Sequence, residues 1–136
     1  MGKIIYVLLS MLAFFTLQVF AQCSCNSPAT VTDPSQSPFT IFVEDGYYEP
    51  DCLTISKNIK VQWQWKDGPH TVTSNNGTYG NCNPGKRIAA GDDGDVLPSP
   101  AYTPGLDGLT YMCSYGNHCQ PPKCMVGKIV VTPTPI

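Results

Sequence analysis

Apolar and polar side chains alternate through most of residues 39–132, and this period of two is typical of β-strands that bury one face. The alternation is clearest at residues 59–65, where every second residue, ending with Trp63 and Trp65, is apolar. The three residues between them are polar. We therefore expect a central core strand at this position.

Shorter segments of the same kind predict further strands. They lie at residues 39–43, 52–56, 70–74, 101–103, 109–114 and 128–132. Residues 75–100 are rich in Gly, Asp, Asn and Pro, so we expect mostly loop there, with a short element near residues 87–90. Seven or eight short strands with frequent turn signals predict an all-β fold, a Greek-key β-sandwich or barrel at residues 39–132.

The N-terminal residues have the features of a secretory signal peptide. Lys3 precedes an apolar run at residues 4–14, and small residues stand at Val19 and Ala21. A membrane anchor is the alternative, but this run is shorter than the ~20 residues that a spanning helix needs. We expect cleavage before Gln22 and a secreted, soluble product without a membrane span.

The mature chain is expected to begin with an extended arm and to end with a short tail. Residues 22–38 are rich in Ser, Thr, Pro and Asn, and residues 133–136 follow the last predicted strand. Without residues 1–21, which contain Lys3 as their only charged residue, the formal net charge changes from −2 to −3. No basic run is present to bind phosphates, so nucleic acid is not an expected partner. A weakly acidic surface can steer a cationic partner, although charge alone does not identify it.

Seven cysteines in a small exported chain predict a disulfide framework, and their odd number leaves at least one thiol unpaired. A free thiol is a liability in an oxidising compartment unless a metal holds it, and Cys113 is our candidate for that role. The other six cysteines can pair in many ways, and the sequence alone does not choose among them. They are Cys23, Cys25, Cys52, Cys82, Cys119 and Cys124.

Four residues with metal-binding side chains occur in two places. His70 follows the predicted core strand, and Cys113, His118 and Met125 lie around one loop between the last two strands. Two imidazoles, one thiolate and a weak axial thioether are the ligand set of a mononuclear blue-copper site. Each residue alone has an ordinary structural explanation. Their coincidence, with the only two histidines of the chain in these contexts, favours one bound copper ion.

At these residues the chain resembles the cupredoxins, the family of plastocyanin, azurin and the phytocyanins. Residues 61–65 and 68–72 are similar to the family's strand and first histidine ligand. Residues 103–113 are similar to the turn and the cysteine, and residues 125–131 to the methionine and last strand. The resemblance covers roughly residues 39–132. It implies that His70, Cys113 and His118 are the equatorial copper ligands and Met125 is the axial ligand.

The resemblance also implies one disulfide. Phytocyanins have a cysteine directly after the second histidine, bridged to a cysteine in the long loop in the middle of the chain. Cys119 directly follows His118, and Cys82 lies between Asn81 and Asn83. A bridge between Cys82 and Cys119 is therefore our preferred pair, and it would stiffen the site.

Two features depart from the family pattern. Six residues separate His118 from Met125, whereas the family usually has about three or four, and they include Cys124. Gln120 is an alternative axial ligand, because some phytocyanins use glutamine there. Thr71 stands where many relatives have an asparagine that hydrogen-bonds across the site, and a threonine would replace it only partly.

These observations predict a secreted, monomeric one-electron carrier with redox protein partners that the sequence does not identify. An enzyme is not expected, because both histidines are used and none is left for a second copper centre or a Ser/His/Asp arrangement. The alternative is a secreted cupredoxin-like module with a binding, structural or copper-sequestering role. The triplet Asn76-Gly77-Thr78 is an N-glycosylation sequon, which matters if the host exports by a eukaryotic route.

Overall fold

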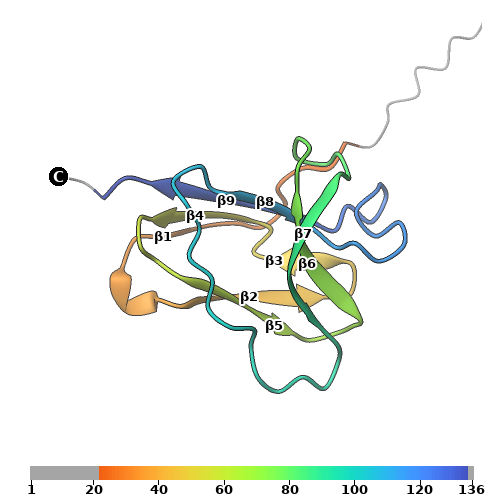
Figure 1. Cartoon of the computed structure of the whole chain (residues 1–136), viewed down its shortest axis with the longest axis horizontal. Coiled ribbons are helices and arrows are strands. Elements are labelled where there is room, and N and C mark those ends of the chain that lie inside the picture. The colour runs from red at the N-terminus through yellow and green to blue at the C-terminus, as the bar shows by residue number, and fades with distance from the viewer. Residues whose placement is uncertain (1–21, 135–136) are drawn as a thin grey trace, which may run out of the picture.

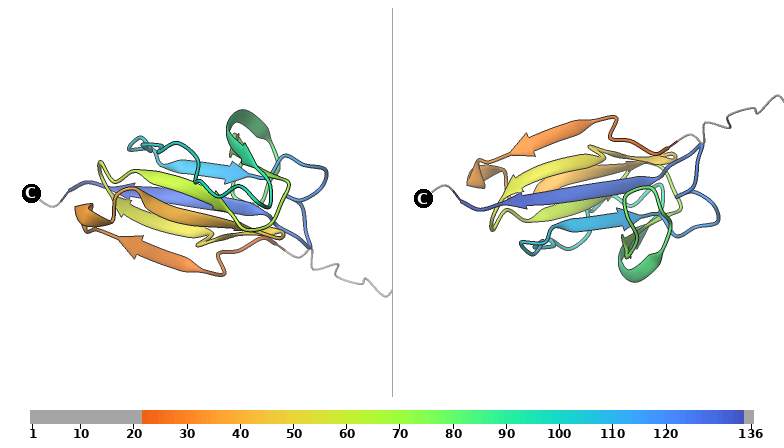
Figure 2. Two further views of the ribbon diagram at one scale, coloured as in Figure 1. Left: turned by 90° about the horizontal axis from the view of Figure 1, so that it is seen from below. Right: turned by 90° about the horizontal axis from the view of Figure 1, so that it is seen from above.

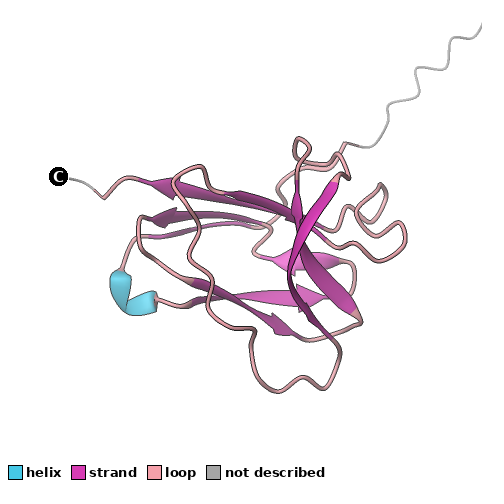
Figure 3. Cartoon of the chain, viewed as in Figure 1, coloured by secondary structure: helices cyan, strands magenta, loops and turns pink. Residues whose placement is uncertain are grey.

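Two β-sheets face each other across the core of the protein (Figures 1 and 2). This computed structural model describes residues 22–134, so the predicted signal peptide at residues 1–21 lies outside the described residues. The one helix within the described residues is a single 3-10 turn at Pro34–Gln36 (Figure 3), and no described helix is long and apolar enough to cross a membrane. The all-β prediction is confirmed, with nine strands in place of seven or eight.

The larger sheet has six strands in the order β1-β4-β9-β8-β6-β7, and the smaller sheet has three in the order β3-β2-β5. The strands are β1 (Pro28–Val31), β2 (Phe39–Glu44), β3 (Tyr47–Glu49), β4 (Cys52–Ser56), β5 (Val61–Trp65), β6 (His70–Asn75), β7 (Pro84–Gly91), β8 (Leu109–Met112) and β9 (Val126–Thr132). Strands β1, β4 and β9 run parallel to one another, whereas β9, β8, β6 and β7 are antiparallel neighbours. The segment predicted as an N-terminal arm thus contributes an edge strand.

The core lies between the two sheets, and its side chains come from the alternating positions of both. The largest fully buried side chains include Ile41, Tyr48, Leu53, Ile55, Trp63, Tyr111 and Ile129. Burial of this apolar surface is the main force that holds the sheets together. The period-two pattern therefore predicted these strands for a sound physical reason.

The position of β5 differs from the prediction of a central strand. Val61, Trp63 and Trp65 are buried as expected, but β5 is at the edge of the smaller sheet. Its free edge is covered by a loop, in which Tyr102 exchanges backbone hydrogen bonds of 2.7 and 2.8 Å with Val61. The strand predicted at residues 101–103 is reduced to this single bridge. Burial of one face does not reveal how many neighbours a strand has.

Strand β7 corrects a second prediction. Residues 75–100 were expected to be mostly loop with a short element near residues 87–90. That element is part of a longer strand, Pro84–Gly91, which pairs with β6 along the edge of the larger sheet. None of the eight residues of β7 is fully buried, and the pairing contains two register shifts. The sequence therefore has no alternation here, because an irregular and exposed edge strand needs none.

The N-terminal segment is attached to β4 by a disulfide and a buried carboxylate. Cys25 is bonded to Cys52, the first residue of β4. Asp51 is 6% exposed, and its carboxylate accepts hydrogen bonds from the backbone N–H groups of Asn26 (2.8 Å) and Ser27 (3.0 Å). These contacts fix the segment before β1 to the body of the sandwich.

Gly127 tests the packing between β8 and β9. It lies opposite Tyr111, and a Cβ atom at this position would overlap with the Tyr111 ring. That ring is fully buried and packs edge-on against Tyr48 and Trp63, so it has no space to move. We expect Gly127→Ala to lower the free energy of unfolding by about 1–3 kcal/mol, measured by denaturant unfolding. Gly105→Ala is the control, because open space surrounds Gly105, and equal losses in both variants would contradict this packing.

Candidate metal centre

Three strand ends bring the predicted ligands to one end of the sandwich. His70 is the first residue of β6, Cys113 directly follows β8, and Met125 directly precedes β9. Strands β6 and β8 are antiparallel, with Thr73 opposite Met112, so the start of β6 lies beside the residues that follow β8. Strand β9 pairs with β8 from the other side. Sheet register therefore gathers three of the predicted ligands, which are up to 55 residues apart in sequence.

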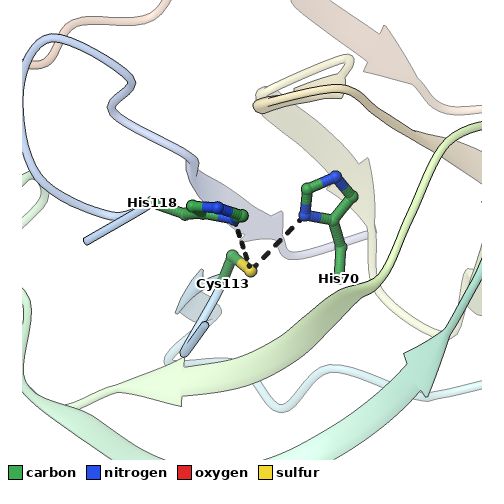
Figure 4. A group of neighbouring side chains, drawn as sticks. All are labelled: His70, Cys113 and His118. Atoms are coloured by element: carbon green, nitrogen blue, oxygen red, sulfur yellow. Dashed lines mark hydrogen bonds between the residues drawn. The ribbon is translucent and has the colours of Figure 1, made fainter. Parts of the chain in front are cut away.

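His70, Cys113 and His118 form a compact group (Figure 4). The Cys113 Sγ lies 3.7 Å from Nδ1 of His70 and 3.6 Å from Nδ1 of His118. The two imidazole rings are 5.2 Å apart and inclined by 55°. Cys113 is fully buried and outside every disulfide of the described residues, His70 is buried, and His118 is half-buried. The prediction that Cys113 is the unpaired cysteine agrees with this geometry.

The separations between the donor atoms fit a single metal ion. Metal–nitrogen bonds of about 2.0 Å and metal–sulfur bonds of about 2.3 Å, at angles of about 120°, place N and S roughly 3.7 Å apart. The observed separations are 3.6 and 3.7 Å. A neutral thiol has one hydrogen and can donate it to only one of the two rings. A soft sulfur with two imidazoles suits copper or zinc rather than magnesium or calcium.

The environment of His70 keeps its imidazole neutral. Burial lowers the pKa of His70, and the neighbouring His118 lowers it further, whereas Asp45 and Asp67 have the opposite effect. A neutral imidazole has a free lone pair on one ring nitrogen, which is the form that binds a metal. The buried ring is therefore prepared for coordination at neutral pH.

A cluster of three hydroxyl groups connects the histidine strand to the cysteine segment. The Ser114 N–H donates to Thr71 Oγ1 at 2.8 Å, which joins the residue after Cys113 to the residue after His70. The hydroxyls of Thr71, Thr73 and Ser114 also lie within 2.9–3.2 Å of one another. Thr71 therefore makes a hydrogen bond across the site, at the position where many relatives have asparagine.

Two buried aromatic residues hold the backbone next to His70. The Trp65 Nε1–H donates to the His70 carbonyl at 3.1 Å, and the Tyr48 hydroxyl donates to the Thr71 carbonyl at 2.6 Å. Burial raises the pKa of Tyr48 far above its usual value, so its hydroxyl remains a donor. Sequence reasoning placed Trp65 only in the core and missed Tyr48, because a tyrosine in a three-residue strand has no distinguishing pattern.

The backbone of Met125 bridges the other two residues of the loop. Its N–H donates to the His118 carbonyl at 2.8 Å, and its carbonyl accepts from the Cys113 N–H at 3.0 Å. Residues 119–124 therefore form a bulge whose ends, His118 and Met125, are hydrogen-bonded to each other. The Met125 side chain is fully buried in the same core cluster as Cys113, whereas Gln120 is exposed. The six residues of this bulge extend outward without separating His118 from Met125.

All six remaining cysteines are paired. The bridge between Cys82 and Cys119, preferred from the resemblance, is confirmed. The sequence did not predict the other two pairs, Cys25–Cys52 and Cys23–Cys124.

Comparison with known proteins finds distant matches among solved structures alone. No protein-family model and no curated protein matches the sequence. Among solved structures, the chain is similar to the copper-containing nitrite reductase NirK from Thermus scotoductus SA-01, with 20% identity over 73% of this chain and a TM-score of 0.49. It spans only 23% of that nitrite reductase chain.

Two smaller proteins are also similar. One is an oxidized amicyanin mutant, with 18% identity, coverage of 70% of this chain and 82% of that chain, and a TM-score of 0.47. The other is reduced auracyanin from Roseiflexus castenholzii, with 19% identity, coverage of 79% and 100%, and a TM-score of 0.45. All three likenesses have TM-scores below 0.5, so they carry no conclusion about the family of this chain. At these identities and TM-scores, the assignment of a function depends on the site residues themselves.

Thr71 provides a test of the hydrogen bond across the site. We expect Thr71→Val to lower the unfolding free energy of the metal-free protein by about 1–3 kcal/mol, because the partly buried Ser114 N–H loses its acceptor. Cys113 should also react faster with a thiol reagent. Thr71→Ser keeps the hydroxyl and should remain close to the wild type in both measurements. A valine variant as stable and as unreactive as the serine variant would show that the hydroxyl has no such role.

Proposed function

We propose that this chain is a secreted type 1 (blue) copper protein that carries one electron at a time between redox partners. One observation carries the proposal: Cys113, the free cysteine of the described residues, is fully buried with Nδ1 of both histidines within 3.7 Å of its sulfur. A structural module would have no physical need for a buried, unpaired thiol between two imidazoles.

Copper would supply the one-electron couple of Cu(II) and Cu(I), and the protein residues would hold it in nearly one geometry. His70, Cys113 and His118 are the proposed equatorial ligands. Met125 is the proposed axial ligand, and its full burial next to this group favours it over the exposed Gln120. The buried face around His70 excludes water, and the half-buried His118 brings one edge of the site close to solvent.

Other properties belong to the same proposal. Three disulfides suit an oxidising compartment, in agreement with export directed by residues 1–21. Asn76 is exposed, as glycosylation of its sequon requires. The protein would act as a monomer with other redox proteins, without a reaction of its own. Within residues 22–134 the one candidate metal-binding group of His, Cys, Asp and Glu residues is the site described above.

Copper titration of the purified protein tests this function. We expect an intense blue thiolate-to-copper absorption band at one equivalent of Cu(II), which ascorbate bleaches and reoxidation restores. Cys113→Ser should lose the band completely while its circular dichroism remains that of the wild type, because the three disulfides are intact. A colourless wild-type protein would favour the structural role, rapid exchange of bound copper would favour sequestration, and a blue Cys113→Ser variant would refute the cysteine assignment.

Met125→Leu tests the axial ligand. A thioether donates electron density and favours Cu(II), so its loss should raise the reduction potential with the blue colour retained. Each tenfold change in the relative affinity for the two oxidation states corresponds to about 59 mV. Met112→Leu is the matched control, because Met112 is buried in a separate cluster, and voltammetry should find its potential unchanged. An unchanged potential in Met125→Leu would point to a different axial group or to none.

A further inference from the structure

Disulfides hold the bulge at residues 119–124 at both of its ends. Cys119, directly after His118, is bonded to Cys82 in the loop before β7. Cys124, directly before Met125, is bonded to Cys23 in the N-terminal segment, with a Cα–Cα distance of 5.4 Å across 101 residues of sequence. The second bridge therefore ends next to the proposed axial ligand.

The backbone of Cys124 has a conformation that requires support. Its φ is 51°, in the left-handed region that residues with a Cβ atom avoid. In this conformation the Cys124 carbonyl accepts from the Val126 N–H at 2.7 Å, and the chain turns so that the Met125 N–H meets the His118 carbonyl. The conformation of Cys124 thus determines how Met125 enters the site.

Apart from the hydrogen bond that the Cys124 N–H donates to the Gln120 carbonyl at 3.0 Å, the surroundings of the bulge offer little other support. Four buried residues form a small cluster separate from the main core, and two of them are half-cystines: Cys23, Met112, Cys119 and Val126. Residues 120–123 are exposed. With so little apolar surface to bury, the covalent bridges are the main restraint on this segment.

The N-terminal segment is itself firmly attached. Two residues after Cys23, Cys25 is bonded to Cys52 at the start of β4, and Asp51 accepts hydrogen bonds from the next two backbone N–H groups. A continuous set of contacts thus runs from β4 through residues 23–27 to Cys124 and Met125. The segment before β1 connects the rigid sheet to the loop of the candidate site.

We propose that Cys23 and Cys124 are positioning residues, whose disulfide holds Cys124 in its left-handed conformation and thereby fixes Met125 between His118 and Cys113. The effect of this disulfide on a bound copper ion rests on the proposed function. Its effect on the loop backbone is expected in the metal-free protein as well. The N-terminal segment then serves as an external brace for the axial side of the site.

Amide hydrogen exchange of the metal-free protein tests the brace. In Cys23→Ala/Cys124→Ala, the Met125 and Cys113 amides should exchange roughly tenfold faster than in the wild type, because their hydrogen bonds open locally. The matched control is Cys25→Ala/Cys52→Ala. It removes a bridge of the same segment but leaves Cys124 bonded to Cys23, and the hydrogen bonds from Asn26 and Ser27 to Asp51 still attach the segment to the sheet. In this control the exchange rates of the Met125 and Cys113 amides should stay within about twofold of the wild-type rates. All proteins are compared well below their unfolding temperatures.

A second variant separates the loss of the Cys23–Cys124 disulfide from the backbone strain of a positive φ at residue 124. Cys23→Ala/Cys124→Gly also lacks the bridge, but glycine adopts a positive φ without strain, so this variant should fold even if the alanine variant does not. We expect faster exchange of the Met125 amide here too. Wild-type exchange in this variant, or equal exchange in the alanine variant and the Cys25/Cys52 control, would overturn the proposal.

The copper-loaded proteins show whether the brace acts on the metal. Loss of the Cys23–Cys124 bridge should shift the reduction potential and accelerate copper loss to a chelator, whereas loss of Cys25–Cys52 should change neither. An unchanged potential and copper-loss rate in a blue protein would overturn the role of the brace at the axial ligand. If the wild type does not turn blue, the proposed function fails, and amide exchange still decides whether the bridge holds the loop.

Discussion

A single buried sulfur between two imidazoles is the constraint to which the rest of this structure is adapted. Cys113 has no solvent exposure and no disulfide partner, and both histidines direct Nδ1 toward its sulfur. Burial of a thiolate is unfavourable unless a positive charge compensates it, and a metal ion would supply that charge. The burial that lowers the pKa of His70 also keeps a lone pair available for the same ion. The site is thus consistent with metal binding in both its geometry and its electrostatics.

Several independent contacts keep these donors in place. Backbone hydrogen bonds from Met125 connect His118 to Cys113, and the Thr71 hydroxyl connects the strand of His70 to Ser114. Trp65 donates a hydrogen bond to the carbonyl of His70, and Tyr48 donates one to the carbonyl of Thr71. An electron carrier benefits from ligands that move little between oxidation states, and supporting contacts of this kind provide that stiffness. The rigidity comes from the scaffold, not from the ligands alone.

Disulfides share this task with the apolar core. The main core between the sheets includes Cys113 and Met125, whereas the bulge at residues 119–124 rests on a small cluster built largely from half-cystines. Small disulfide-rich domains commonly compensate for a limited core in this way. Here the two bridges at Cys119 and Cys124 allow a longer loop than the family pattern has, because its two ends remain hydrogen-bonded to each other.

The sequence by itself determined the all-β class and the strands with a strongly alternating pattern, because side-chain period is a local property. From donor chemistry it also predicted four candidate residues of the site, of which the structure brings His70, Cys113 and His118 into one group. It also identified Cys113 as the free thiol and, through the resemblance, the Cys82–Cys119 bridge. Tertiary structure alone decided which strands lie at the edges, since β7 has no buried face and β5 obtains its cover from a distant loop. The tertiary structure also decided that the Tyr48 hydroxyl holds the Thr71 carbonyl and that Cys23 is bonded to Cys124. Those contacts join residues 23 and 101 positions apart, and no local pattern of side chains specifies how distant segments meet.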